Sequence, residues 1–228
     1  MSTDEVHQAV EDFADAAVRA ELAGFNGVEV HGGHGFLVGQ FLDASNNHRV
    51  DGYGSDPDGR SRFVKEVVHT IRQRTGPDFH VGLRLSVERH GQILTDMVDL
   101  VRDLFADGDI DVLDLSLWDV RKLPENAPEG AKPLIDHFLD LPRHGVALGA
   151  AGHIGTAEEA QRLIDQGVDL AYIGKAAVAD RDFARNAIHD TEYRPQEFPL
   201  TPDQLRDERL GDSFIDYFAT NWPDLVQH

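Results

Sequence analysis

The sequence contains no cysteine, only four lysines and no long apolar run. Without cysteine the chain can form no disulfide, thiolate metal site or cysteine-ligated iron–sulfur cluster. No apolar run approaches the roughly 18 residues that a membrane span needs, and the opening MSTDEVHQAV lacks the basic and apolar regions of a secretory signal. These absences predict a cytoplasmic protein with no membrane partner.

Acidic residues dominate the charged part of the composition. Asp and Glu number 41 against 21 Lys and Arg, which gives a formal net charge of −20. The resulting field repels nucleic acid, so we expect no nucleic-acid partner. An acidic, lysine-poor surface suits high intracellular salt, where screening makes self-repulsion tolerable. Two interpretations stay open: a salt-adapted protein of halophilic type, or simply an acidic cytosolic protein.

Apolar runs and helix-period patterns alternate along the chain, which at 228 residues is long enough for one domain with a sizeable core. Strict strand–helix alternation predicts an α/β fold with a parallel sheet. Capping boxes beginning at Ser2 and Thr156, and glycines at Gly24 and Gly167, bound two of the helices. We expect strands at residues 27–31, 81–86, 111–116, 145–149 and 170–174, and helices near 2–23, 60–75, 93–104, 134–139 and 156–166.

Polar residues and glycines follow each of these predicted strands. Because the carboxyl ends of parallel strands meet at one edge of a sheet, we expect these groups to converge there, as in the active site of a (β/α) barrel. A closed barrel of this type has about eight strands, whereas about five are evident in the sequence.

Two histidines three residues apart, His31 and His34, lie at the end of the first predicted strand and in the loop after it. They could ligate a metal, but no cysteine, glutamate or third histidine at suitable spacing completes a site, so we predict no metal. A structural role and a pair of hydrogen-bond donors to a substrate oxygen both stay open. The string GGHGFLVG also resembles a dinucleotide-binding loop, although it does not fit G-x-G-x-x-G.

A phosphate site is predicted near the last two strands. Gly152 and His153 stand before the capped helix at Thr156, where backbone N–H groups are free, and Gly174 and Lys175 follow the next strand. This arrangement is typical of the phosphate sites that barrel enzymes build after their last strands.

Arg84 lies inside a strand, between two leucines. A guanidinium in a sheet is costly unless it meets an anion or a polar ligand. Either it contacts a ligand, or it forms a buried ion pair with one of the many carboxylates. Glu29 and Asp114 are also polar residues within strands, and we interpret them as structural partners.

The chain resembles the old yellow enzyme family of FMN-dependent NAD(P)H:flavin oxidoreductases, or ene-reductases. The resemblance lies in AGFNGVEVHGGHGFLVGQFLDASNNHRVDGYGS, VGLRLS, VLDLS, GAAGHIGTAEEAQRLIDQGVDLAYIGKA and DRDFARNA, which cover the chain to about residue 190 in the family's order. It implies a TIM barrel with FMN at the carboxyl ends of the strands, reduced by NADH or NADPH. The substrate would be a small molecule of the enone type, which accepts hydride from the flavin at its β-carbon.

The resemblance also implies roles for individual residues. His31 and His34 would hydrogen-bond the substrate's carbonyl oxygen, and Arg84 would lie beside the flavin ring and favour its anionic reduced form. The phosphate of FMN would meet Gly152 and His153, together with Gly174 and Lys175. The family usually has arginine where Lys175 stands, so a point charge replaces a bidentate fork.

Two departures from the family pattern shape the expected activity. Phe36 stands where the family has its proton-donating tyrosine, so we expect weak ene-reduction, with water protonating the α-carbon or another acceptor dominating. The family's first three strands have no counterpart here. We therefore expect a partial (β/α)8 TIM barrel at residues 1–198, a helical tail at 199–228, and a requirement for a complementary N-terminal half polypeptide or a homo-oligomer. The alternative is a non-catalytic, degenerate fragment that acts as an interaction subunit.

Overall fold

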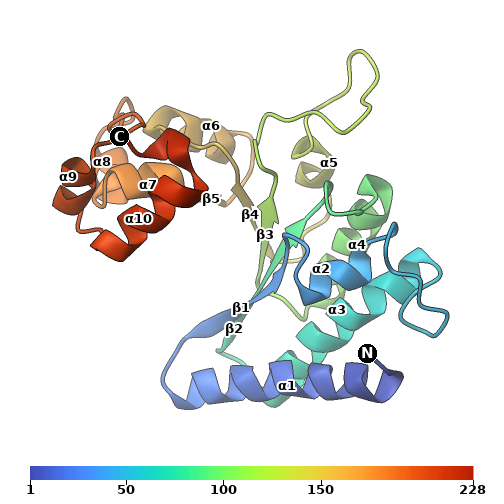
Figure 1. Ribbon diagram of the computed structural model, residues 1–228. Helices are drawn as coiled ribbons and strands as arrows, with labels where there is room; N and C mark the ends of the chain where they lie inside the picture. The colour runs from blue at the N-terminus through green and yellow to red at the C-terminus, as the bar shows by residue number, and fades with distance from the viewer. Residues whose placement is uncertain (228) are drawn as a thin grey trace. The chain divides into compact units, whose positions relative to one another are not determined.

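The computed structural model describes residues 1–227 and divides into two compact units (Figure 1). The first unit comprises Met1–Ala150 and Val168–Leu170, and the second comprises Ala151–Gly167 and Ala171–His228. The elements follow in the order α1 (Thr3–Leu22), β1 (Gly27–Gly32), α2 (Leu37–Leu42), α3 (Pro57–Arg74), β2 (His80–Ser86), α4 (Leu94–Asp107), β3 (Val112–Ser116), α5 (Asp136–Leu139), β4 (Ala147–Ala151), α6 (Ala157–Asp165), β5 (Leu170–Tyr172), α7 (Lys175–Ala179), α8 (Phe183–His189), α9 (Pro202–Asp207), α10 (Asp212–Asn221) and η1 (Pro223–Leu225).

The five strands form one sheet in the order β1-β2-β3-β4-β5. Each strand therefore lies beside its neighbour in the chain, and a helix connects each pair, as parallel pairing requires. This confirms the α/β architecture and the five parallel strands predicted from the sequence. The fourth strand begins two residues later than predicted, at Ala147.

The strands β1 to β3 present one apolar and one polar face, because successive side chains alternate across a strand. The apolar face carries Val30, Leu83 and Leu113, which occupy one row of the strand register and are at most 3% exposed. Figure 1 shows α2, α3 and α4 on the same side of these strands. The next row carries His31, Arg84 and Asp114. The register thus places three ionisable side chains from three strands on one face of the sheet.

The ends of two helices follow the sequence signals. Ser2 accepts a hydrogen bond from the N–H of Glu5, whose carboxylate accepts from the N–H of Ser2, so the predicted capping box is confirmed. Thr156 likewise accepts from the N–H of Glu159. The return bond goes instead from Gly155 N–H to the Glu159 carboxylate, so the second box is shifted by one residue.

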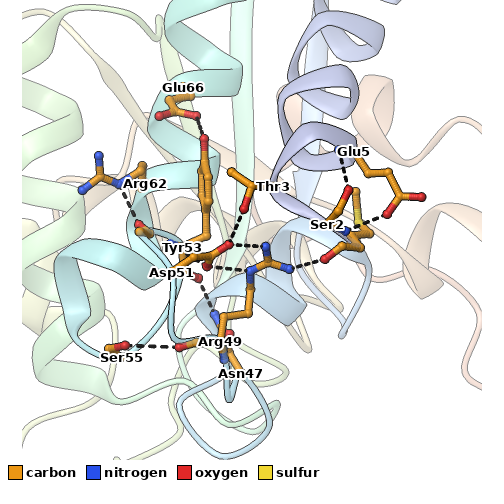
Figure 2. A network of polar contacts seen from close by, with 12 residues as sticks. Ser2, Thr3, Glu5, Asn47, Arg49, Asp51, Tyr53, Ser55, Arg62 and Glu66 are labelled. Carbon is orange, nitrogen blue, oxygen red and sulfur yellow. Dashed lines mark hydrogen bonds and ion pairs between the residues drawn. The ribbon is translucent and has the colours of Figure 1, made fainter.

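The loop between α2 and α3 is held by a polar network that includes the N-terminus of α1 (Figure 2). Arg49 donates to Asp51 at 3.0 and 2.5 Å and to the Met1 carbonyl at 2.8 Å. Tyr53 is 4% exposed and donates its hydroxyl to Glu66 on α3 at 2.7 Å. A Cβ at Gly59 would lie 2.1 Å from the carbonyl oxygen of Gly54, so only glycine permits the close approach that starts α3. The residues of this loop therefore contact one another and fix its conformation.

The second unit has a core of its own. Its buried apolar residues are Ala179, Leu200, Leu205, Ile215, Phe218, Leu225 and Val226. The predicted domain boundary near residue 198 stays a prediction. None of the helices in residues 1–227 combines the length and apolar character that crossing a bilayer requires.

Candidate active site

Four of the predicted site residues lie in the first unit, on β1, β2 and the loop that follows β1. His31 belongs to β1, and its register partner on β2 is Arg84. His34 and Phe36 lie just beyond β1, where the chain turns into α2. The same row continues to Asp114 on β3. The parallel register therefore brings a cation, a carboxyl group and two imidazoles to the carboxyl half of one sheet face.

Arg84 is anchored through one nitrogen only. Its Nε donates to Ser116 Oγ at 2.6 Å and lies 3.0 Å from Asp114 Oδ2. Its side chain is 32% exposed, whereas that of Asp114 is 2% exposed. Neither Nη atom makes a hydrogen bond to any of residues 1–227. The ion pair predicted as one alternative is thus present, and it leaves the outer edge of the guanidinium available to a ligand.

Asp114 is a site residue whose importance the sequence did not reveal. Its Oδ1 atom is buried without a hydrogen-bond partner. Burial raises the pKa of Asp114 to about 6, with Arg84 acting in the opposite direction and Glu29 in the same direction. A carboxylate that is unpaired at one oxygen and buried is costly, so this group is held in balance between its protonated and ionised forms.

The two predicted histidines contact each other. His31 Nε2 lies 3.3 Å from His34 Nδ1, and the ring centroids are 5.1 Å apart. The pKa of both imidazoles is lowered, first by desolvation and then by the charge of Arg84. Both rings are therefore neutral at neutral pH. Two neutral rings carry two N–H groups, one of which is used within the pair, so one N–H remains for an external acceptor.

Glycines and Ser86 fix the position of the pair. Ser86 Oγ, at the end of β2, accepts a hydrogen bond from the backbone N–H of His34 at 3.0 Å. A Cβ at Gly32 would lie 2.9 Å from the Arg84 carbonyl oxygen and 2.7 Å from the Leu85 side chain, so glycine allows β1 to end close against β2. His34 itself adopts a left-handed backbone conformation with φ 57°. The Gly-Gly-His sequence is thus explained by the turn that places His34 next to His31.

Phe36 packs beside the pair. Its ring centroid lies 5.2 Å from that of His31, and the side chain is 61% exposed. Phe36 is also the N-cap residue of α2 and makes no side-chain cap. The position is thus beside the imidazoles and open to a ligand, yet the side chain carries no proton that could be transferred.

The other four predicted residues belong to the second unit and form a separate set. Gly152 and His153 both have positive φ, 147° and 48°, in the turn before α6. Gly174 caps α7, of which Lys175 is the first residue. Lys175 is exposed and makes no ion pair with any carboxylate in residues 1–227. This set offers a cation and turn backbone, which suit an anionic ligand. No group of three or more His, Asp or Glu within residues 1–227 is arranged to hold a metal ion.

Comparisons with known proteins place the chain in a family. The sequence model of the NADH:flavin oxidoreductase / NADH oxidase family matches residues 1–193. An NADPH dehydrogenase of Bacillus pumilus (strain SAFR-032) is 32% identical over 197 residues, which are 83% of this chain and 56% of that protein. An NADH:acrylate oxidoreductase of Vibrio harveyi is 30% identical over 201 residues, which are 83% of this chain and 20% of that protein.

Solved structures give the same result for the fold. The structure of morphinone reductase in complex with tetrahydroNAD superposes with a TM-score of 0.69 at 29% identity, covering 90% of this chain and 53% of that one. The sheet and helices are therefore similar to part of a TIM barrel, as predicted. The chain spans about half the length of the NADPH dehydrogenase and of morphinone reductase.

Proposed function

Because the chain belongs to the NADH:flavin oxidoreductase / NADH oxidase family, we propose that it forms the acceptor-binding part of an oxidoreductase of the old yellow enzyme type. FMN, with NADH or NADPH as reductant, is the cofactor typical of this family. The chemistry that FMN would supply here is hydride transfer from the reduced nicotinamide to the β-carbon of an activated alkene, such as an enone. The observation that carries the proposal is the His31–His34 pair beside the open edge of Arg84 on one sheet face.

The residues present fit FMN by their chemistry. Arg84 offers unbonded Nη groups to ring oxygens and to the negative charge that a flavin gains on reduction. Lys175 carries a charge that no carboxylate in residues 1–227 neutralises, which suits the flavin's phosphate. The family resemblance assigns both of these cations to FMN, in a chain whose 41 acidic residues outnumber its 21 basic ones.

The histidine pair would act on the acceptor. One neutral N–H is free to bind a carbonyl oxygen, and opening of the 3.3 Å contact between His31 and His34 would free a second. Such hydrogen bonds withdraw electrons from the conjugated alkene and stabilise the negative charge that develops on the oxygen. Desolvation, and after it the charge of Arg84, lowers the pKa of both rings and so favours their neutral form.

Protonation of the α-carbon is the step for which this chain lacks a side chain. Phe36 lies beside His31, where a hydroxyl could donate a proton, but the phenylalanine ring has no proton to donate. The proton must then come from water, which reaches this position because Phe36 is 61% exposed. The proposal therefore predicts slow alkene reduction, with faster turnover on acceptors that need no such proton.

The proposal includes a complement that completes the sheet, because the chain spans about half the length of its relatives. The complement would be a separate N-terminal half polypeptide or another copy of this chain. The alternative function is an interaction subunit without turnover, which the phenylalanine at position 36 favours.

Purification at high salt, with and without a co-expressed N-terminal half, separates these functions. The proposal expects a yellow preparation whose flavin band bleaches anaerobically with NADH or NADPH and returns when an enone is added. Arg84→Gln should weaken retention of FMN, whereas Arg62→Gln, which removes a charge bonded to the Gly52 carbonyl, should not. A preparation that is colourless under both conditions and takes up no added FMN would favour the interaction subunit.

A further inference from the structure

Arg89 and Trp118 form a stacked pair on the loops that follow β2 and β3. The Arg89 guanidinium carbon lies 3.9 Å from the centroid of the Trp118 ring. Both side chains are exposed, that of Trp118 at 62%. A guanidinium so close to an indole is held by the ring's negative face, which fixes its plane while leaving its edge N–H groups directed outward.

Both residues of the pair have strained backbone conformations. Arg89 has φ 87° and Trp118 has φ 65°, and both values lie in the left-handed region that bulky side chains rarely adopt. Two strained residues from loops 29 positions apart in the sequence meet in one contact. Strain of this kind accumulates where function requires a particular side-chain direction.

The nearby carboxylates are engaged elsewhere. Glu88 pairs with Lys122 at 3.1 Å, and Asp119 pairs with Arg121 at 2.9 Å. Arg89 makes no ion pair with any carboxylate in residues 1–227. In a chain with 41 acidic residues, a cation held on an aromatic ring and not paired with a nearby carboxylate remains available to an external anion.

The loop that carries Arg89 reaches the candidate active site through its next residue. His90, the residue after Arg89, has its ring centroid 6.3 Å from that of His34. We propose that Arg89 and Trp118 bind an oxyanion, a carboxylate or a phosphate, on a ligand whose other end reaches the His31–His34 pair. The anion binding stands without FMN, whereas the ligand's role as acceptor or reductant rests on the proposed function.

Two ligands share this chemistry, and the experiment distinguishes them. A carboxylate would come from an unsaturated acid acceptor, and a phosphate would come from the nicotinamide dinucleotide. The probes are crotonate for the first, and the oxidised dinucleotides NAD⁺ and NADP⁺ for the second. The chain has two tryptophans, so Trp222→Phe leaves the emission of Trp118 as the only indole signal.

Titration of each probe into flavin-free Trp222→Phe protein at constant ionic strength is the test. At least one probe should change the emission saturably, and Arg89→Gln in the same background should raise its Kd roughly tenfold. The Kd of Arg89→Lys should lie between those of the Trp222→Phe parent and Arg89→Gln, because lysine keeps the charge and loses the planar fork.

Arg209→Gln is the matched control. Arg209 is also exposed, also left-handed at φ 69° and also without an ion pair in residues 1–227, and no ring is stacked beneath it. In the Trp222→Phe background, the Arg209→Gln variant should bind each probe with the same Kd as the Trp222→Phe parent. The proposal is overturned if no probe changes the emission, or if the two glutamine variants bind alike. Failure to bind FMN, with saturable probe binding retained, would overturn the proposed function and leave the anion site intact.

Discussion

Arg84 and Asp114 occupy the same register row on neighbouring strands, with Nε 3.0 Å from Oδ2. The pair is asymmetric, because the guanidinium reaches solvent at 32% exposure while the carboxyl group is buried with Oδ1 unpaired. The ion pair therefore does not fully compensate the desolvation of Asp114. This follows the general behaviour of buried ion pairs, in which the cost of removing charge from water can exceed the attraction between the partners.

Asp114→Asn should change how stability depends on pH. A pKa raised from 3.8 to about 6 in the folded state means that folding favours the protonated form, so stability is present at low pH and is lost as pH rises through about 6. Relative to the native chain, the asparagine variant should gain up to about 3 kcal/mol in unfolding free energy between pH 4 and pH 7.5. Urea unfolding at both values measures this difference. Asp96→Asn, at the partly exposed ion pair with Arg60, serves as the control. A difference that is the same at both pH values would show that folding does not raise the pKa of Asp114.

The strands could be predicted from the sequence where a short apolar run is bounded by polar or turn-forming residues. The second strand was predicted at Val81–Ser86, because polar residues close the run of valine and leucine on both sides, and the structure begins β2 one residue earlier, at His80. Helix α2 was missed; its six residues include a glycine, and its N-cap, Phe36, offers no side-chain acceptor. Short helices of this kind are stabilised by burial of residues such as Val38 and Phe41, which only the folded structure reveals.

The site was less predictable than the fold because its key contacts join distant strands. His31 and His34 could be found from their spacing, and their mutual contact follows from the turn at two glycines. The pairing of Arg84 with Asp114 depends on strand register, which the sequence does not specify. The Arg89–Trp118 stack joins two loops and carries no motif at all.

Lys175→Gln should weaken binding of FMN roughly tenfold if the ammonium meets the flavin phosphate. Lys175→Arg should bind FMN at least as tightly as the native chain, since its fork matches phosphate oxygens in pairs. Quenching of FMN fluorescence on titration gives both affinities, and riboflavin, which lacks the phosphate, is the control ligand. An equal loss of riboflavin affinity in Lys175→Gln would indicate damage to the fold rather than loss of a phosphate contact.

Molar potassium chloride should raise the melting temperature. A net charge of −20 repels itself at low salt, and at roughly 1 M salt the Debye length falls to about 3 Å, which suppresses that repulsion. We expect a rise of at least about 5 °C between roughly 0.1 M and 2 M KCl, or more than about 1 kcal/mol for a chain of this size. Melting curves that coincide would reject the salt-adapted interpretation in favour of an ordinary acidic protein.

Tyr53→Phe should destabilise the loop before α3 without altering the sheet. The hydroxyl donates to Glu66 at 2.7 Å, and burial together with that bond raises the pKa of Tyr53 to about 12. Loss of a hydrogen bond to a charged acceptor costs roughly 1.5–3 kcal/mol, measurable by urea unfolding. Tyr217 is 49% exposed and its hydroxyl makes no hydrogen bond within residues 1–227, so Tyr217→Phe should cost almost nothing. Equal stabilities of the two variants would mean that the Tyr53–Glu66 bond contributes nothing.

Under the proposed function, Phe36→Tyr should speed the reduction of alkenes. The ring lies 5.2 Å from His31 and is 61% exposed, so a hydroxyl at its tip has room and can reach a substrate held by the histidines. A positioned proton donor typically contributes 10²–10⁴-fold, so we expect a gain of roughly a hundredfold in the rate at which an enone reoxidises the reduced flavin. Reoxidation by a quinone, which needs no proton delivered to carbon, should change little. Phe25→Tyr, at a phenylalanine 66% exposed before β1, supplies the control for an added hydroxyl. If both acceptors speed up equally, the tyrosine acts on the flavin environment and not as the proton donor to the α-carbon.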